Sequence, residues 1–338
     1  MSELLRLDRW MGQAAAAYYA RHDPFADFVT APELTQVFGE LLGAWAVAVW
    51  RTMDTPRLRL VEAGPGRGTL IADALRLIGR VAPDAATAID LHLIETSPRL
   101  RDLQRAAIAA VRPGLAPVWH ECLDTVPPGP MVLLANEFLD ALAVRQWVRR
   151  DGGWQERCVA SGRVVETACE PDGAPAAVLA RAGEGEVAEW SPDALAFTAA
   201  LATRLARDGG AALLVDYGYD SRQEGFPEGG SLQALRGGRP ADPFEAPGEA
   251  DLTAHVDFIT LGECAREAGA AVHGPVGQGA LLSALGLFAR TEALSRAAPE
   301  RARSLIDAAH RLAAPERMGR LFKALCLCDP SASVPPGF

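Results

Sequence analysis

Metal-binding and disulfide patterns are missing from this chain of 338 residues. Its six cysteines include no CxxC pair and no zinc-like spacing with the six histidines, so we expect core thiols in a reducing cytosol and no metal site. Apolar runs reach only about ten residues, too short to cross a bilayer. The opening residues, MSELLRLDRW, carry early acids and no apolar signal core. The sequence therefore predicts a cytoplasmic protein that does not insert into a membrane.

Basic residues are in the minority. The chain has 33 lysines and arginines against 43 aspartates and glutamates, which gives a net charge of −10. Because neutralised phosphates supply most of the affinity for nucleic acids, we expect no nucleic-acid partner. Hydrophobic residues at 49% and charged residues at 22% are typical of globular proteins. The length allows a full α/β core together with an accessory unit.

Short apolar runs alternate with helical stretches over most of the chain. This alternation predicts an α/β fold with a parallel sheet and helices on both faces. The strands are expected at 58–63, 89–95, 116–121, 131–136 and 211–217, and the closing strands are expected from 271–285 and 320–328.

Composition and pattern divide the chain into four parts. Helix 31–50 carries an apolar stripe that we expect to pack in the core. The turn sequence Asp151-Gly152-Gly153 predicts an antiparallel hairpin, in a flap that faces a substrate or forms a homodimer. A Gly/Pro-rich loop insertion spans 220–250. The parts are a helical N-terminal cap at 1–55, the two halves of the core at 56–143 and 191–338, and an antiparallel β insertion at 144–190.

A glycine-rich turn follows the first strand of the core. The spacing is Glu62-x-Gly64-x-Gly66-x-Gly68, and a helix is expected from Thr69. Strand, tight turn and helix allow the backbone to approach a nucleotide-like ligand closely. The third glycine comes one residue earlier than in a dinucleotide fingerprint. Glu62 would repel a pyrophosphate but suits the α-ammonium of S-adenosylmethionine. The alternative is an ordinary glycine-rich turn.

A second acid ends the next strand. Glu95 stands where nucleotide-binding α/β units place the residue that accepts hydrogen bonds from ribose hydroxyls. Alternatively, Glu95 neutralises the N-terminus of the next helix, in which Ser97 is the cap and Pro98 takes the first position. The turn and the acid, one helix apart, favour a class I methyltransferase with a Rossmann-like sheet and S-adenosylmethionine as cofactor.

Polar residues crowd the end of strand 131–136. Asn136, Glu137 and Asp140 stand where parallel strands present their ligand sites. A guanidinium acceptor calls for carboxylates that take its N–H groups in pairs, so Glu137 and Asp140 are candidate catalytic residues. Phe138 offers a face for the planar acceptor. The alternative is a solvated loop whose acids cap the following helix.

Other polar residues complete the candidate site. His255 is a candidate base or substrate contact, and Thr253 is expected to cap a helix that begins near His255. Thr30 and Glu33, at the opening of helix 31–50, are expected to fold over the cofactor. Asp216-Tyr217-Gly218 either belongs to the ligand side or makes a structural turn. The predicted cofactor-binding set is Glu62, Gly64, Gly66, Gly68, Thr69, Glu95, Asn136, Thr30 and Glu33.

Seven stretches, in the same order along the chain, resemble the MidA family, which includes the mitochondrial complex I assembly-factor methyltransferase. Together they span nearly the whole sequence, which makes them far more specific than any one motif. They are FVTAPEL (28–34) with Gln36 and FGE (38–40), VEAGPGRGTL (61–70), LIETSPRLR (93–101), ANEFLDAL (135–142), LLVDYG (213–218), DPFEAPGEADLTAHVDF (242–258) and MGRLFKAL (318–325).

This resemblance implies a class I S-adenosylmethionine fold and a protein substrate. The expected reaction is arginine methylation of the 49-kDa-type subunit of NADH:quinone oxidoreductase, respiratory complex I, with a role in its assembly. One alternative is an assembly chaperone that binds the cofactor without turnover. The other is a nicotinamide oxidoreductase, which the glycine spacing and Glu62 disfavour. The matching positions are Gly64, Gly66 and Gly68 for the cofactor, Glu95 for its ribose, and Asn136 and Glu137 near the acceptor.

Overall fold

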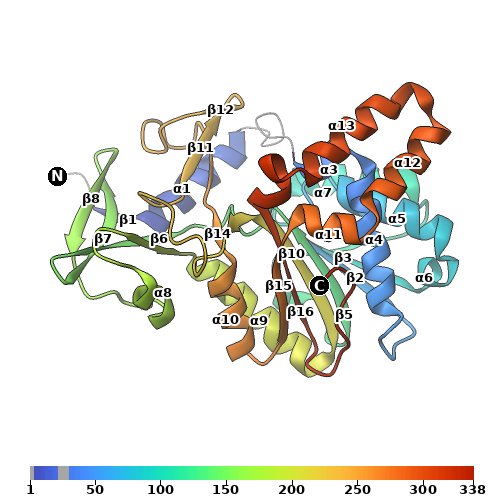
Figure 1. Ribbon diagram of the computed structural model, residues 1–338, viewed down its shortest axis with the longest axis horizontal. Coiled ribbons are helices and arrows are strands. Elements are labelled where there is room, and N and C mark those ends of the chain that lie inside the picture. The colour runs from blue at the N-terminus through green and yellow to red at the C-terminus, as the bar shows by residue number, and fades with distance from the viewer. Residues whose placement is uncertain (1–3, 22–29) are drawn as a thin grey trace. The chain divides into compact units, whose positions relative to one another are not determined.

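The computed structural model describes residues 4–21 and 30–338 (Figure 1). The first two residues of the 28–34 motif lie outside these ranges. The described chain forms two compact units, each built from three segments. Unit 1 contains residues 4–21, 139–197 and 217–264, and unit 2 contains residues 30–138, 198–216 and 265–338.

Unit 2 holds the larger sheet. Five strands run parallel in the order β4-β3-β2-β5-β10, and β16 and β15 follow at the far edge as an antiparallel pair. The last residues of β10, from Tyr217 on, belong to unit 1. The strands are β2 (Leu58–Ala63), β3 (Ile89–Ile94), β4 (Val118–His120), β5 (Met131–Asn136), β10 (Gly210–Tyr219), β15 (Ala271–Gly277) and β16 (Phe322–Cys328).

The order of the strands fixes where a ligand can bind. From β2 the chain adds β3 and β4 on one side, and it then returns to place β5 on the other side of β2. Ligands of open α/β sheets bind outside the carboxyl ends of the strands at such a reversal. Gly64 follows β2 and Glu137 follows β5, so two of the predicted site segments meet at this point.

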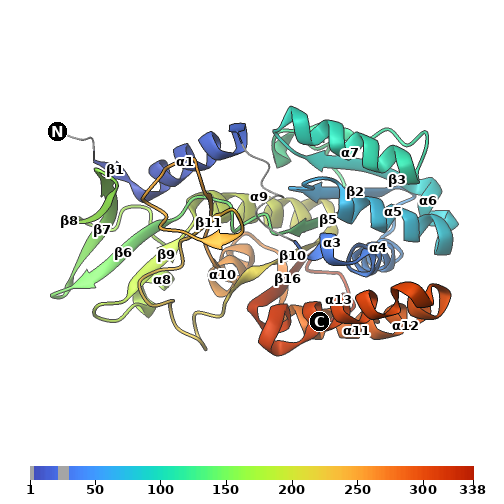
Figure 2. The ribbon, with the colours of Figure 1, turned by 90° about the horizontal axis from the view of Figure 1, so that it is seen from above.

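Helices cover the sheet of unit 2, and two of them approach each other unusually closely. Figure 2 shows α4 beside α5. A Cβ atom on Gly43 of α4 would lie 2.7 Å from the Cα of Ala74 in α5. Four residues earlier, a Cβ on Gly39 would lie 2.7 Å from the Leu70 carbonyl oxygen. The two glycines share one helix face, so α4 packs directly against the α5 backbone. The helices are α3 (Ala31–Leu34), α4 (Gln36–Trp50), α5 (Thr69–Val81), α6 (Pro83–Ala88), α7 (Pro98–Val111), α11 (Gln278–Ala284), α12 (Leu287–Ala297) and α13 (Ala302–Ala313).

Unit 1 contains a smaller antiparallel sheet, in which β6, β7 and β8 run side by side (Figure 2). The β6–β7 connection is Asp151-Gly152, with φ values of 51° and 76°. A two-residue turn with both φ angles positive matches the twist of the strands, so the predicted hairpin is confirmed. This sheet contains β1 (Leu5–Arg6), β6 (Arg145–Arg150), β7 (Gly153–Ala160), β8 (Arg163–Ala168) and β9 (Val187–Trp190).

Elsewhere in unit 1, α1 (Leu7–Arg21) packs against a three-stranded sheet. Trp10 and Met11 of α1 contact a cluster that includes Leu252 of this sheet. Two of its strands lie within 220–250, so the prediction that this whole region is a loop is wrong in part. The remaining elements are β11 (Gln233–Arg236), β12 (Arg239–Pro240), β13 (Asp251–Thr253), β14 (Val256–Asp257) and α8 (Ala176–Arg181), with α9 (Pro192–Asp208) and α10 (Phe258–Glu267) each contributing residues to both units.

Two other expectations about elements are wrong in part. Helix 31–50 is interrupted at Thr35, whose backbone is extended and whose hydroxyl accepts a hydrogen bond from the Val37 N–H, so α4 starts afresh after α3. The closing strand ends at Gly277, and residues 278–284 form α11 instead of continuing the strand. Within residues 4–21 and 30–338, none of the helices combines the length and the apolar character needed to span a bilayer.

Candidate active site

The glycine-rich turn joins β2 to α5 as predicted. Gly64, Gly66 and Gly68 have φ values of 66°, 56° and 82°, a region that residues with a side chain rarely adopt. The Gly64 N–H donates to the Ile94 carbonyl at 3.1 Å, which ties the turn to the end of β3. Each glycine is therefore required by the backbone conformation itself.

Neighbouring residues leave little room around this turn. A Cβ on Gly64 would lie 2.8 Å from the Cδ2 of Phe138, in the segment that follows β5. A Cβ on Gly68 would lie 3.1 Å from the Cα of Gln104 in α7. Side chains at either position would displace the segments that flank the turn.

Glu62 is a buried acid in β2. The side chain is 2% exposed, and its Oε2 has no hydrogen-bond partner among the described residues. Burial raises the pKa of Glu62 to about 8. A carboxylate in this position favours a cation beside it, because a cation would compensate the cost of burying the charge.

Glu95 lies at the end of β3 and is held by α7. Its Oε1 accepts a hydrogen bond from the Ser97 N–H at 2.8 Å, and its Oε2 accepts one from Nε2 of Gln104 at 3.2 Å. The Ser97 hydroxyl in turn accepts from the Leu100 N–H at 3.4 Å, so the predicted cap is present. A carboxylate accepts about four hydrogen bonds, which leaves Glu95 capacity for two more. Both roles considered for this acid remain compatible with its position.

Glu137 follows β5 in a conformation that is uncommon for its residue type, with φ at 50°. Its Oε1 accepts hydrogen bonds from the Ala31 N–H and from Nδ2 of Asn136, both at 3.0 Å. Its Oε2 is buried and has no hydrogen-bond partner among the described residues. Burial raises the pKa of Glu137 to about 7, and the two hydrogen bonds oppose that shift. One oxygen is therefore held by two hydrogen bonds, and the other is buried without one from the described residues.

The segment around α3 joins the same edge of the sheet. The Thr69 hydroxyl donates to Oε1 of Glu33 at 2.6 Å. Thr30 directly precedes the Ala31 N–H that binds Glu137, and it flanks α3 as the cap residue without a side-chain cap bond. The structure thus brings together, within unit 2, all nine predicted cofactor-binding residues and Glu137.

Asp140 and His255, the other two candidate catalytic residues, belong to unit 1. The Asp140 carbonyl accepts a hydrogen bond from the Ala254 N–H at 2.9 Å, so the two candidates lie on adjoining segments of that unit. His255 packs edge-to-face on Tyr217, with 4.8 Å between the ring centroids. Its Nε2 lies 2.9 Å from Nε2 of Gln233.

The prediction that Thr253 caps a helix is wrong. Thr253 belongs to β13, and its hydroxyl is hydrogen-bonded to the phenol of Tyr217. The helix α10 begins at Phe258, and the side chain of Asp257 accepts from the backbone N–H groups of Ile259 and Thr260 at 3.1 and 3.4 Å. Pairing of β13 with β11 keeps Thr253 extended and moves the cap four residues onward.

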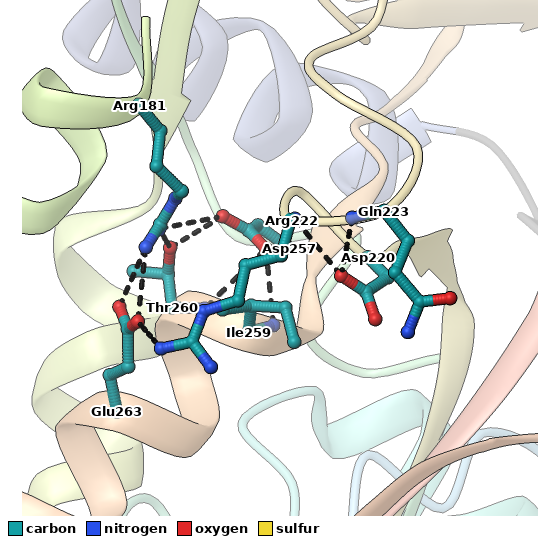
Figure 3. A network of polar contacts seen from close by, with 8 residues as sticks. All are labelled: Arg181, Asp220, Arg222, Gln223, Asp257, Ile259, Thr260 and Glu263. Atoms are coloured by element: carbon teal, nitrogen blue, oxygen red, sulfur yellow. Dashed lines mark hydrogen bonds and ion pairs between the residues drawn. The ribbon is translucent and has the colours of Figure 1, made fainter.

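Sequence patterns also missed an ion-pair network in unit 1 (Figure 3). The guanidinium of Arg181, at the end of α8, contacts Asp257 at 3.4 Å and Glu263 at 2.9 Å. Arg222 contacts the same Glu263 at 2.6 Å. These residues come from separate stretches of chain with no motif in common, so spacing alone gives no signal for the network. It fixes α8 against α10.

The comparisons with known proteins agree with this geometry. Residues 41–276 match a family model described as "Putative S-adenosyl-L-methionine-dependent methyltransferase". The chain belongs to this methyltransferase family. The match spans both the glycine-rich turn and the segment that contains Glu137, and the sheet has the strand order of a class I methyltransferase, so the fold expected from the sequence is confirmed.

Relatives and a solved structure extend the match over nearly the whole chain. The mouse protein arginine methyltransferase NDUFAF7 is 35% identical over 93% of this chain and 77% of its own length. The fruit-fly homologue is 35% identical over 92% and 78% of the two chains. A crystal structure of a Burkholderia thailandensis protein bound to S-adenosyl-homocysteine superposes with a TM-score of 0.84 and 30% identity, over 99% of this chain and 90% of that one.

This methyltransferase uses S-adenosylmethionine, and the residues of unit 2 fit that cofactor. The glycine-rich turn would let the backbone approach it, and Oε2 of Glu62, which has no hydrogen-bond partner among the described residues, would receive its ammonium group. Glu95 would accept hydrogen bonds from the ribose hydroxyls with its two remaining acceptor positions. When bound, the cofactor supplies a methyl group on a sulfonium, which is electrophilic at carbon.

Proposed function

We propose that this methyltransferase transfers the methyl group to an arginine side chain of a protein. The observation that carries the proposal is Glu137, whose Oε2 is buried and without a hydrogen-bond partner among the described residues. A carboxylate with one free oxygen at the carboxyl edge of β5 suits a guanidinium N–H. The names of the mouse and fruit-fly relatives, both protein arginine methyltransferases, support the same acceptor.

Glu137 has two tasks in this proposal. Its carboxylate accepts an N–H of the guanidinium and orients the attacking nitrogen, which is the larger part of catalysis in a methyl transfer. The nitrogen–methyl bond then forms while the sulfonium–methyl bond breaks, and the methylated guanidinium loses a proton late in the reaction. A pKa of about 7 allows Oε2 of Glu137 to accept that proton near neutral pH. Asp140 and His255 remain candidates for further acceptor contacts.

The acceptor protein is, in our proposal, the 49-kDa-type subunit of respiratory complex I, and its methylation aids assembly of the complex. The sequence resemblance supports this target. We also propose that the protein acts in the cytoplasm, since all six cysteines are free thiols, as suits a reducing compartment. A homodimer formed through the β6–β8 sheet is a further part of the proposal. Fractionation of cells and the mass of the purified protein in solution test these last two points.

Radiolabelled methyl transfer tests the acceptor. The purified protein is incubated with labelled S-adenosylmethionine and the isolated complex I subunit, and the product is hydrolysed and analysed for methylarginine. Label in methylarginine is the expected result. Label in another residue would overturn the arginine assignment. If nothing is labelled in the subunit or in a cell lysate, while deletion of the gene still impairs complex I assembly, the protein is an assembly chaperone that binds the cofactor without turnover.

A further inference from the structure

Gln104 is a polar side chain in a fully buried position. It lies on α7 with no exposed surface, on the same helix face as the buried Ile108. Buried polar side chains are hydrogen-bonded because an unmade bond costs the full desolvation of the group. A glutamine in an apolar helix stripe therefore indicates hydrogen-bond partners inside the protein.

Every hydrogen-bonding position of the Gln104 amide but one acceptor lone pair is used. Nε2 donates to the Gly66 carbonyl at 2.8 Å and to Oε2 of Glu95 at 3.2 Å. Oε1 accepts from Nε1 of Trp119 at 2.8 Å. The orientation of the amide follows from these partners, because a flipped amide would face two acceptors with its oxygen and an N–H donor with its nitrogen.

The three partners of Gln104 come from three separate elements. Gly66 is the middle glycine of the turn, Glu95 is the acid at the end of β3, and Trp119 belongs to β4. The backbone of Gln104 also lies against the turn, since a Cβ on Gly68 would approach its Cα to 3.1 Å. One amide thus links the glycine-rich turn to the acid assigned to the ribose.

We propose that Gln104 is a positioning residue for cofactor binding. It holds the Gly66 carbonyl and the Glu95 carboxylate in fixed positions, so that the turn and the ribose acid are arranged before the cofactor arrives. Binding to a preformed site avoids the cost of ordering these groups at the moment of association. Gln104 acts through its neighbours, since it has no exposed surface of its own. The inference rests on the proposed role of Glu95, and it does not depend on which acceptor is methylated.

Three substitutions test this role by calorimetric titration of S-adenosyl-homocysteine. Gln104→Met keeps the length of the side chain and removes all three hydrogen bonds, and we expect it to weaken binding at least tenfold. Ile108→Val is the matched control on the same buried face, because it changes an apolar side chain and removes no hydrogen bond, and its affinity should stay within twofold of the parent. When Glu95→Ala is already present, adding Gln104→Met should reduce the logarithm of the affinity by less than half as much as it does in the parent. Part of the effect of Gln104 is exerted through Glu95, which the first substitution has removed.

Gln104→Glu gives a second readout that depends on protonation. The introduced carboxyl can still accept from Trp119, but in its ionised form it repels Glu95. At low pH a proton restores a donor toward Glu95 or Gly66. We therefore expect affinity for S-adenosyl-homocysteine to recover toward the parent value between pH 8 and pH 5.5, whereas Gln104→Met shows no such recovery beyond any pH dependence of the parent.

Two outcomes would overturn the proposal. One is binding by Gln104→Met within twofold of the parent. The other combines two results: Gln104→Met lowers the affinity equally with and without the Glu95 carboxylate, and the affinity of Gln104→Glu does not recover at low pH. Gln104 would then contribute to packing only. If Gln104→Met fails to fold, the pH series of Gln104→Glu decides alone. Since no acceptor is present, failure here is separate from failure to methylate arginine.

Discussion

Oε1 of Glu137 lies 3.0 Å from the backbone nitrogen of Ala31, so a residue after β5 is held by the first turn of a short helix 106 positions earlier in the chain. This bond uses one oxygen of the carboxylate and directs the other, Oε2, away from Ala31. An acid fixed in this way is preorganised, because it needs no reorientation when an acceptor binds. The N-terminal segment of unit 2 therefore helps to shape the candidate catalytic centre.

Glu137→Gln should leave cofactor affinity near the parent value and reduce methyl transfer about 10²-fold or more, a loss of roughly 3 kcal/mol in transition-state stabilisation. The change keeps the shape of the side chain and removes its charge. Because the pKa of Glu137 is raised to about 7, the fraction of ionised carboxylate grows as pH increases through 7. The methyl-transfer rate of the parent should therefore rise as pH increases through 7. The rate of the Glu137→Gln variant should not show this rise. Initial rates from pH 6 to pH 8.5 measure both effects.

The control for this experiment is Glu316→Gln, an exposed acid in the same unit. Its rate and pH profile should match those of the parent. A fully active Glu137→Gln variant would remove Glu137 from the catalytic set, and Asp140 would then be the next residue to substitute.

Glu62→Gln should stabilise the cofactor-free protein at high pH and lower its affinity for S-adenosylmethionine. The folded pKa of about 8 exceeds the ordinary value of 4.5, so the stability that this group contributes is full below pH 4.5 and is lost as pH rises through 8. Glutamine removes that loss, so the free energy of unfolding at pH 8.5 should increase by a few kcal/mol. Urea titrations at pH 5 and pH 8.5 measure the difference. Calorimetry should show affinity for S-adenosylmethionine at least tenfold lower.

Glu95→Ala should weaken cofactor binding by roughly ten- to a hundredfold, since hydrogen bonds to a charged group contribute about 1.5–3 kcal/mol. The substitution also releases the Ser97 N–H, so the helix should be checked by circular dichroism. An affinity within twofold of the parent would mean that Glu95 serves the N-terminus of α7 and not the ribose.

Gly43→Ala should destabilise the protein by about 1–3 kcal/mol, because the new methyl group would overlap the α5 backbone beside Ala74. The matched control is Gly12→Ala in α1, where no atom of the described residues outside the adjoining helix backbone lies within 4 Å of the added Cβ. Alanine has the higher helix propensity, so this control should gain up to about 1 kcal/mol. Denaturant unfolding of the two variants and the parent gives both values. Equal effects of the two substitutions would show that close packing of α4 and α5 does not limit stability.

Local patterns were sufficient for the central part of unit 2. The apolar runs that became β2, β3 and β5 are buried on both sides of the sheet, so each stood out as a short continuous stretch. The glycine-rich turn was recognisable because its φ angles exclude most other residues. In these segments the residue types that the local backbone and burial require are the same ones that a sequence pattern detects.

Contacts between distant segments could not be predicted from the sequence. The interruption at Thr35 and the bond from Ala31 to Glu137 depend on which segment packs beside which, and neither leaves a periodic signal. Thr253 resembled a helix cap because its sequence neighbourhood is polar, yet pairing with β11 decided its conformation. Tertiary context overrides local preference in such cases.

The alternation of segments between the two units has a genetic consequence. Six segments follow one another along the chain, and each unit takes every second one. No contiguous part of the gene therefore encodes either unit, and a deletion from either end removes pieces of both once it passes one segment. To exchange unit 1 for that of a relative, three separate stretches of coding sequence must be replaced together. A single crossover anywhere between residues 30 and 264 therefore yields chains in which neither unit comes from one parent alone.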